Sequence, residues 1–289
     1  MPARLLTLED SFTRLTLAPQ TGAAIVNWSV LGSDLPLLRH SDAAAIESGL
    51  PGKLGCYGLI PWSNRIAQGG FQCPEGWLAL TPNNPGDPLP IHGSAWQQPW
   101  EVLEQQADSV LLELHADYPF AYRARQRVQL KDGCLSIELQ VTHLDSAPAW
   151  HGLGLHPYFP RRADSRLQAH AEQVWHCAET RLPTELGALP PAWNFRQAND
   201  LPPTLVDNGF TEWDGQCRII EASAGYQLLC QASGADYFLL YCPPGKAFFC
   251  FEPVSHPVNA HHLPGHPGLR LLEQGQSTEL TFSLQYQPL

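Results

Sequence analysis

Proline and glycine occur throughout the chain, and their distribution limits the possible folds more than any other feature. The 289 residues include 27 prolines and 23 glycines. Both interrupt helices, because proline lacks the amide hydrogen that a helix uses and glycine loses the most backbone freedom when it is ordered. Long helices therefore have little room, and the distribution predicts a chain of strands and turns.

Between these interruptions, apolar residues alternate with polar ones. The pattern at 128–141, with a Lys-Asp-Gly turn at 131–133, is typical of a β-hairpin, and the alternation returns at 280–286. Three further strands are expected at 226–231, 236–242 and 247–252. This spacing predicts an all-β fold, a large antiparallel sandwich or barrel, and we expect a single domain over residues 1–289. The proline-rich segment 181–203 is expected to be a long loop across one face of the sheet.

Charge and cysteine content narrow the class of protein. The formal net charge is -11 and the chain has only three lysines, which argues against nucleic acid and anionic membranes as partners. An apolar run of about 18 residues, long enough to span a membrane, is not found in the sequence. The eight cysteines form no C-x-x-C pair, so neither a zinc site nor a disulfide framework is indicated. The N-terminus lacks a secretory signal, and we expect a cytoplasmic protein.

The stretch HGLGLHPYFP at 151–160 contains two histidines in an apolar, glycine-punctuated run. Proline favours an extended conformation for the residue before it and cannot donate a ladder hydrogen bond, so a strand should end near His156 and Pro157. A histidine at a strand end has an ordinary pKa close enough to neutrality to give and take protons. His156 is therefore a candidate for acid–base chemistry.

Three other short motifs accompany this stretch. They are PWSNRI at 61–66, IHG at 91–93 and FEPVSHP at 251–257. With GLHPYF at 154–159, and in this order, they make the chain resemble the aldose 1-epimerase (galactose mutarotase-like) family. The resemblance runs from about Gly22 to the C-terminus. It implies a twisted β-supersandwich whose concave face holds a sugar.

The resemblance also implies an activity: interconversion of the α and β anomers of a free hexose. Ring opening needs a base at the C1 hydroxyl and an acid at the ring oxygen. By position in the family motifs, Glu252 is the expected base, His156 the expected acid, and His92 a second histidine that hydrogen-bonds near the ring oxygen. This chemistry requires no metal, nucleotide or covalent intermediate, so no cofactor is expected.

Substrate-binding residues follow from the same motifs. Arg65 matches a family arginine that contacts sugar hydroxyls, and a guanidinium offers several donors in a fixed fork. Asn64 beside it is expected to bind substrate or to support the turn. Asp207 resembles the family's substrate-binding aspartate, although Asp214 lies close by in the sequence. Trp62 and Trp213 are expected as platforms for the apolar face of the sugar.

Some features leave alternatives open. Arg161 and Arg162 directly follow the HPYFP stretch and would favour a phosphorylated or acidic sugar as substrate. The tract 256–266 contains four histidines, for which adventitious surface positions are expected and metal binding is the alternative. A third alternative is a non-catalytic carbohydrate-binding or sensor protein, because a fold alone does not fix a function. The presence of both Glu252 and His156 argues for an enzyme, since a protein that only binds sugar needs no acid and base.

Overall fold

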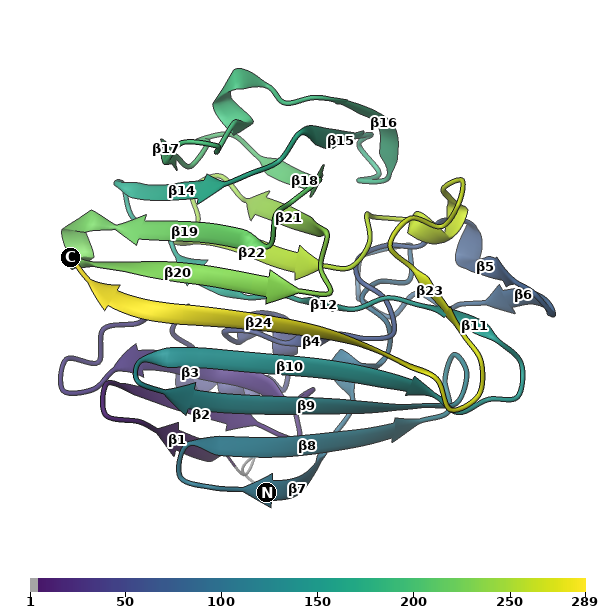
Figure 1. Cartoon of the computed structure of the whole chain (residues 1–289), viewed down its shortest axis with the longest axis horizontal. Helices are drawn as coiled ribbons and strands as arrows, with labels where there is room; N and C mark the ends of the chain where they lie inside the picture. Colours follow the sequence, from purple (N-terminus) through teal and green to yellow (C-terminus); the bar gives the residue numbers. More distant parts are fainter. Residues whose placement is uncertain (1–4) are drawn as a thin grey trace.

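The computed structural model describes residues 5–289, and antiparallel strands dominate it. The largest sheet has nine strands in the order β17-β14-β19-β20-β24-β10-β9-β8-β7 (Figure 1). Its strands are β7 (Glu101–Gln105), β8 (Ser109–Ala116), β9 (Tyr122–Lys131), β10 (Cys134–His143), β14 (Ser165–Ala169), β17 (Asn199–Asp200), β19 (Gln216–Glu221), β20 (Tyr226–Ser233) and β24 (Ser277–Pro288).

A second sheet of eight strands has the order β16-β15-β18-β21-β22-β12-β4, with β13 also paired to β22. These strands are β4 (Gly58–Leu59), β12 (Gly154–Leu155), β13 (Tyr158–Pro160), β15 (Gln173–Cys177), β16 (Pro183–Ala188), β18 (Val206–Thr211), β21 (Tyr237–Cys242) and β22 (Phe248–Val254). In Figure 1, strands β21 and β22 of this sheet lie behind β19 and β20 of the first.

Smaller elements complete the fold. A three-stranded sheet contains β1 (Leu6–Glu9), β2 (Thr13–Ala18) and β3 (Ala24–Val30), and two ribbons pair β5 (Gly70–Cys73) with β6 (Gly76–Ala79) and β11 (Ala149–His151) with β23 (Arg270–Leu272). The one α-helix within residues 5–289 is α1 (Ala43–Glu47). Short 3-10 helices are η1 (Pro51–Lys53), η2 (Ala67–Gly69), η3 (Ala95–Gln97), η4 (Pro191–Trp193), η5 (Ala222–Ala224) and η6 (Ala260–His262). None of the helices in the described part of the chain is long and apolar enough to cross a membrane.

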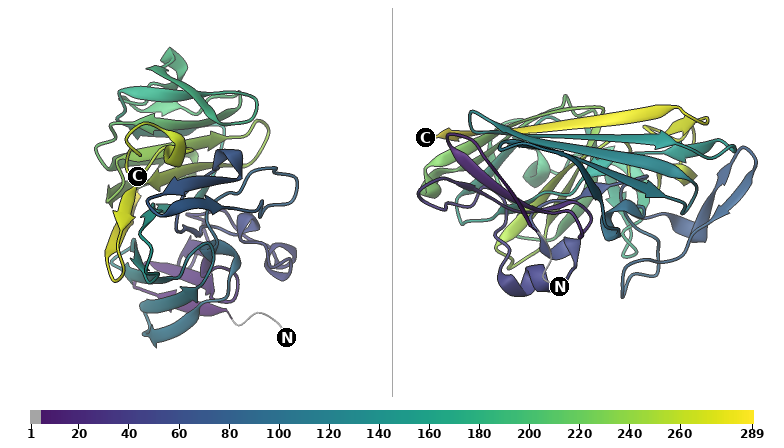
Figure 2. Two further views of the ribbon diagram at one scale, coloured as in Figure 1. Left: turned by 90° about the vertical axis from the view of Figure 1, so that its right-hand side faces the viewer. Right: turned by 90° about the horizontal axis from the view of Figure 1, so that it is seen from below.

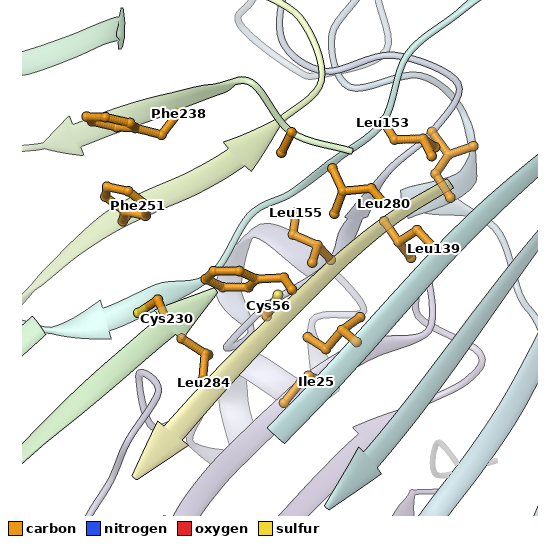
Figure 3. Packing of buried hydrophobic residues seen from close by; sticks show 14 of the residues in the cluster. Ile25, Cys56, Leu139, Leu153, Leu155, Cys230, Phe238, Phe251, Leu280 and Leu284 are labelled. Atoms are coloured by element: carbon orange, nitrogen blue, oxygen red, sulfur yellow. The ribbon is translucent and has the colours of Figure 1, made fainter. Parts of the chain in front are cut away.

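The main hydrophobic core lies between the two large sheets, which stack as layers in the side views of Figure 2. Figure 3 shows four residues of this core from different strands: Leu139 of β10, Leu280 of β24, Phe251 of β22 and Ile25 of β3. All four side chains are almost fully buried. Burying apolar area of this kind is the dominant stabilising contribution in folding. The core thus holds both large sheets and the three-stranded sheet together.

Most of the predicted elements are confirmed. The hairpin at 128–141 is the β9–β10 pair, the stretch 280–286 lies in β24, and the three expected strands correspond to β20, β21 and β22. The prediction for 181–203 was wrong in part, because this segment contains β16, η4 and β17 rather than a continuous loop. Strand β16 pairs with β15 at the edge of the eight-stranded sheet, where prolines are tolerated.

Candidate active site

Strand alternation selects which side chains face away from the main core. In β22, Phe249 and Phe251 point into the core, so Cys250 and Glu252 point to the opposite face of the sheet. A second, smaller apolar cluster covers this opposite face and includes Cys250, Tyr158 and Tyr57. Glu252 is therefore held on a central strand with only 3% of its surface exposed.

His156 lies beside Glu252, in the connection between β12 and β13, which both pair with β22. The predicted strand end is confirmed, since β12 ends at Leu155. The Nε2 atom of His156 is 3.3 Å from the Oε1 atom of Glu252. The imidazole ring stacks on Tyr57 and Tyr158, with centroid distances of 4.9 and 4.7 Å. The ring orientation is thereby fixed by packing, and its Nε2 atom faces the carboxyl group.

Burial controls the protonation of this pair. Desolvation raises the pKa of Glu252 well above its ordinary value, and the nearby Asp207 carboxylate adds to that effect. Desolvation also lowers the pKa of His156 to about 3, with a further contribution from the positive charge of Arg39. Both effects favour the neutral form of each group. A neutral pair holds one titratable proton, on the carboxyl of Glu252, whose Oε1 atom is 3.3 Å from the Nε2 atom of His156.

His92 is a third titratable group at the site. Its Nδ1 atom accepts a hydrogen bond of 3.0 Å from the backbone N–H of Asn64. Desolvation lowers the pKa of His92 well below its ordinary value, and the neighbouring His156 and Arg65 contribute in the same direction. The ring is therefore neutral, and because Nδ1 accepts, its proton resides on Nε2. His92 can consequently donate one hydrogen bond to a ligand.

The loop that follows β4 supplies Asn64 and Arg65. Asn64 has a left-handed backbone with φ 59°, and its Oδ1 atom accepts hydrogen bonds from the N–H of Arg65 at 2.8 Å and from Arg65 Nη1 at 3.2 Å. The Nε atom of Arg65 donates to the Oδ2 atom of Asp87 at 2.9 Å. Asn64 thus acts as a turn residue that also orients the guanidinium. Both side chains face the same cavity.

Asp207 of β18 completes the polar lining. Its carboxylate is 3.2 Å from Nη1 of Arg181, a residue in the loop between β15 and β16. Burial raises the pKa of Asp207, while Arg65 and Arg181 act in the opposite direction. Asp214, the other aspartate close by in sequence, lies in an exposed turn and accepts a hydrogen bond from the N–H of Gln216. The structure therefore places Asp207, and not Asp214, at the site.

The predicted residues His92, His156, Glu252, Arg65, Asn64 and Asp207 all line one cavity of about 230 Å³. The cavity is also lined by residues that sequence reasoning missed: Gly52, Tyr57, Asn84, Ile91, Trp96, Tyr158, Arg181 and Tyr241. Trp96 follows the IHG motif by three residues and stacks on Tyr57 at a centroid distance of 5.4 Å. Its position just after the IHG motif is the sequence signal by which Trp96 could have been identified as a candidate.

The prediction that Trp62 and Trp213 form sugar platforms was wrong. Trp62 is 1% exposed and packs edge-on against Phe71 in the main core. Trp213 packs edge-on against Phe251, on the core side of β22, and neither indole lines the cavity. Both rings stabilise the fold, because their apolar surface is already covered by other side chains. Among the indoles of residues 5–289, it is Trp96 that lines the cavity.

The two arginines that motivated an anionic substrate point elsewhere. Arg161 donates to the backbone carbonyl of Pro202 at 2.7 Å. Arg162 pairs with the buried carboxylate of Glu221 at 3.0 Å. Neither residue lines the cavity. The hypothesis that these arginines select a phosphorylated or acidic sugar is therefore not supported by their positions.

The histidine tract was also misjudged as a surface feature. His256 and His261 are buried, with 1% and 4% of their surfaces exposed, and His266 stacks on Trp150 at 4.2 Å. Within residues 5–289, this tract does not gather three metal-ligand atoms. The cluster that does consists of His156, Cys250 and Glu252, whose ligand atoms lie within 4.8 Å of one another.

His256 connects two segments of the site. Its Nε2 atom accepts a hydrogen bond of 3.0 Å from the N–H of Ser63, and its Nδ1 atom donates to the carbonyl of Pro257 at 2.8 Å. The imidazole packs directly over Gly152, where an added Cβ atom would lie 2.1 Å from the ring. Glycine at 152 therefore makes room for the ring that anchors the loop carrying Asn64 and Arg65.

We expect Gly152→Ala to destabilise the protein by about 1–3 kcal/mol, because the His256 ring must shift and leave the N–H of Ser63 without its partner. Urea unfolding followed by fluorescence measures this loss. Gly209→Ala in β18 is the matched control, since its Cβ atom would meet nothing nearer than 4.0 Å. Equal stability of the two variants would contradict a steric role for Gly152.

A β-sandwich with a histidine–glutamate pair in a polar cavity defines a class of protein suited to acid–base chemistry on a small polar ligand. Comparison with known proteins identifies the particular family. A profile of the aldose 1-epimerase family matches residues 4–285. The chain belongs to the aldose 1-epimerase family, as its motifs predicted.

Individual relatives extend this comparison. The uncharacterized protein YphB of Escherichia coli K12 is 32% identical over 291 residues, covering 97% of this chain and 98% of that protein. A crystal structure described as a candidate aldose 1-epimerase from Escherichia coli K12 has a TM-score of 0.93 at 30% identity and covers 99% of both chains. A galactose mutarotase-like protein from Clostridium acetobutylicum has a TM-score of 0.88 at 17% identity, covering 99% of this chain and 96% of that one. The predicted all-β, galactose mutarotase-like fold is thus confirmed.

Proposed function

We propose that this protein is an aldose 1-epimerase that interconverts the α and β anomers of a free hexose by opening and reclosing the ring. The observation that carries the proposal is the approach of His156 Nε2 to Glu252 Oε1, 3.3 Å apart on one wall of the cavity. The two oxygens that exchange protons in a hemiacetal are bonded to the same carbon. An acid and a base that serve both must therefore lie within a few ångströms of each other.

The proposed cycle begins with the pair and its single proton. When the sugar's C1 hydroxyl donates a hydrogen bond to Glu252, it stabilises the carboxylate form, and the proton of the pair moves to His156. Glu252 then removes the hydroxyl proton while His156 protonates the ring oxygen, which breaks the bond between C1 and that oxygen. Rotation about the C1–C2 bond exposes the other face of the carbonyl. The same two groups, acting in reverse, close the ring.

The other lining residues support binding in this proposal. His92 donates from Nε2 to the ring oxygen or an adjacent hydroxyl, where negative charge develops. Arg65 donates to sugar hydroxyls, and Asp207 accepts from them, so the two cover both hydrogen-bonding roles of a hydroxyl group. Trp96 replaces Trp62 and Trp213 as the indole against which the apolar face of the sugar can rest.

A neutral sugar fits these charges better than an anionic one. The two cavity arginines, Arg65 and Arg181, are each paired with a carboxylate, at 2.9 Å and 3.2 Å. The charges of these two arginines are therefore already balanced by Asp87 and Asp207, and neither is free to neutralise a phosphate. We therefore propose a free, uncharged aldose as substrate.

Polarimetry of freshly dissolved α-D-glucose and α-D-galactose tests the proposal. The protein should speed the approach to the equilibrium rotation beyond the rate in buffer alone. Acceleration of the sugar 6-phosphates in place of the free sugars would overturn the choice of a neutral substrate. No acceleration of any of these sugars would favour the alternative of a sugar-binding protein without catalytic activity.

We also expect kcat/KM to vary little from about pH 5 to neutrality, because activity requires the pair to hold one proton. A second proton binds only near the lowered pKa of His156, about 3 rather than the ordinary 6.5. The fall of activity on the acidic side should therefore lie well below pH 6.5. If the acid were a solvent-exposed histidine with an ordinary pKa, half of the activity would already be lost at pH 6.5. Initial rates by polarimetry, corrected for the buffer reaction, measure the profile, and a midpoint near 6.5 would contradict this account.

A further inference from the structure

Three side chains with metal-binding atoms meet beside the cavity of the candidate active site. The Sγ atom of Cys250, a ring nitrogen of His156 and a carboxyl oxygen of Glu252 lie within 4.8 Å of one another, and all three residues are buried. His156 and Glu252 line the cavity, whereas Cys250 does not. The proposed mutarotation uses the histidine and the glutamate and gives no role to the thiol.

Strand pairing brings these three residues together. Cys250 and Glu252 are two residues apart in β22, so their side chains point to the same face of the sheet. Tyr158 of β13 pairs with Cys250, and His156 precedes Tyr158 by two residues. The register between β13 and β22 therefore places the sulfur next to the histidine as well as the glutamate.

The distances match the size of a tetrahedral metal site. Bonds of about 2.0–2.3 Å from zinc to nitrogen, oxygen and sulfur place neighbouring ligand atoms about 3.3–3.8 Å apart. The Nε2 atom of His156 and the Oε1 atom of Glu252 are already 3.3 Å apart. Since the sulfur lies within 4.8 Å of the other two ligand atoms, it must approach them by about 1 Å or less. A fourth ligand, such as water, would come from the cavity.

The histidine and the glutamate both have ligand atoms available for a metal. The Oε2 atom of Glu252 has no hydrogen-bond partner among the described residues 5–289. The His156 ring stacks on Tyr57 and Tyr158, which hold its plane and direct Nε2 toward the carboxyl group. A ring that is already fixed loses little conformational entropy when it binds an ion. The site is therefore organised for a metal before one arrives.

The charge of the site favours a divalent cation. The Cys250 thiol and the Glu252 carboxyl each release one proton to solvent when they bind a metal, and His156 binds as a neutral ring. One divalent cation thus replaces two protons, and the net charge of the three ligands and the ion stays at zero. This balance is important because the guanidinium of Arg39 lies 3.6 Å from the centroid of the Tyr158 ring and would oppose a gain of positive charge.

The ligand types select the kind of metal. Thiolate sulfur and imidazole nitrogen suit zinc and similar transition metals, whereas magnesium and calcium prefer oxygen ligands. From these observations we propose that Cys250, His156 and Glu252 bind a zinc ion, and that the bound ion inhibits mutarotation by occupying the two groups that exchange protons with the sugar. The ion is then an inhibitor and not a cofactor. The inhibition rests on the proposed function, but the metal site does not.

Co²⁺ is the first probe, because it replaces zinc and absorbs strongly in the ultraviolet when a thiolate binds it. Titration of the native protein, kept reduced with a phosphine, should show this absorption and saturate at one ion per chain. Cys250→Ala should lack the absorption, and His156→Asn should bind Co²⁺ at least about 10-fold more weakly. Cys230→Ala is the matched control and should keep it, since Cys230 is also buried but lies in β20, outside the ligand cluster.

Polarimetry with glucose then tests inhibition. Zn²⁺ should slow mutarotation by the native protein, and EDTA should restore the rate. Without metal, Cys250→Ala should keep its kcat within about threefold of the native value, because the thiol has no part in the proposed cycle. The variant should need at least about 10-fold more Zn²⁺ for half-inhibition, because one ligand is missing.

Two results would overturn the inference: no thiolate absorption in the native protein, or equal absorption in the native protein and Cys250→Ala. If Cys250→Ala does not fold, Cys250→Val takes its place, and His156→Asn binding Co²⁺ as tightly as the native protein overturns the site independently. If the absorption depends on Cys250 but no sugar is turned over, the metal site stands and the proposed function fails. If mutarotation is catalysed and Zn²⁺ leaves it unchanged, the inferred inhibition fails and the proposed function stands.

Discussion

Replacement of Glu252 by glutamine is expected to lower kcat for mutarotation by about 10²–10⁴-fold, the usual contribution of a positioned general base. Glutamine has nearly the same shape but cannot accept a proton from the C1 hydroxyl. Sugar binding should remain, because the proposed hydroxyl-binding residues Arg65, His92 and Asp207 are unchanged. Polarimetry gives the rate, and calorimetry with the same sugar gives the affinity.

The stability of this variant provides a second readout. Glu252 is 3% exposed and its Oε2 atom has no hydrogen-bond partner among residues 5–289. Burial of an unsatisfied ionisable group costs free energy. We therefore expect Glu252→Gln to unfold in urea at the same concentration as the native protein or at a higher one. Loss of activity without loss of stability separates a catalytic role from a structural one.

Glu221→Gln is the matched control for Glu252→Gln. Glu221 is also buried, with 1% exposed, but it lies in the nine-stranded sheet, accepts hydrogen bonds from Ser165 and Arg162, and does not line the cavity. Its replacement should lower stability and leave the rate per folded molecule unchanged. A Glu252→Gln variant that keeps its rate within about threefold of the native protein would contradict the assignment of the base.

Replacement of His156 by asparagine is the second change with a large expected effect. The loss should again be about 10²–10⁴-fold in kcat, because no group remains to protonate the ring oxygen. Asparagine keeps a polar amide near Glu252 but cannot carry the exchanged proton. His143→Asn is the control, since His143 is fully buried and bonds to His151 and Ala147, outside the cavity.

The double variant gives a sharper test, because the proposed mechanism has His156 and Glu252 share one proton. Groups that act as a unit have non-additive effects, so Glu252→Gln combined with His156→Asn should be little slower than either single variant. If the two losses multiply, the residues act independently, and the shared-proton mechanism is wrong. The measurement is the rate of approach to equilibrium rotation at equal concentrations of folded protein.

The class of fold could be predicted from local pattern alone. Period-two alternation fixes which side chains share a face, and the turn at 131–133 fixes the pairing of β9 with β10. The same rule applied to β22 puts Glu252 on the face opposite Phe251. The motif residues that line the cavity could be proposed from the sequence, because each short motif resembles a family motif that carries a functional residue at the same position.

The environment of each residue could not be predicted in this way. The local sequence does not show that Trp96 lines the cavity and Trp62 lies in the core, since Trp62 is within one motif and Trp96 follows another by three residues. Arg161 and Arg162 adjoin the HPYFP stretch in sequence. In the fold, however, Arg161 donates to a backbone carbonyl and Arg162 pairs with Glu221. Arg181 reaches Asp207 from a loop 26 residues away, and no pattern in that loop indicates it.

The sequence by itself therefore determined the all-β architecture, the strand that carries Glu252, and the set of motifs that identify the family. Only the tertiary structure decided the 3.3 Å approach of His156 to Glu252, the neutral state of His92, and the approach of Cys250 to His156. The physical reason is that alternation and turn chemistry act over a few neighbouring residues. Desolvation, charge pairing and cavity shape depend on groups that are brought together only when distant strands and loops pack.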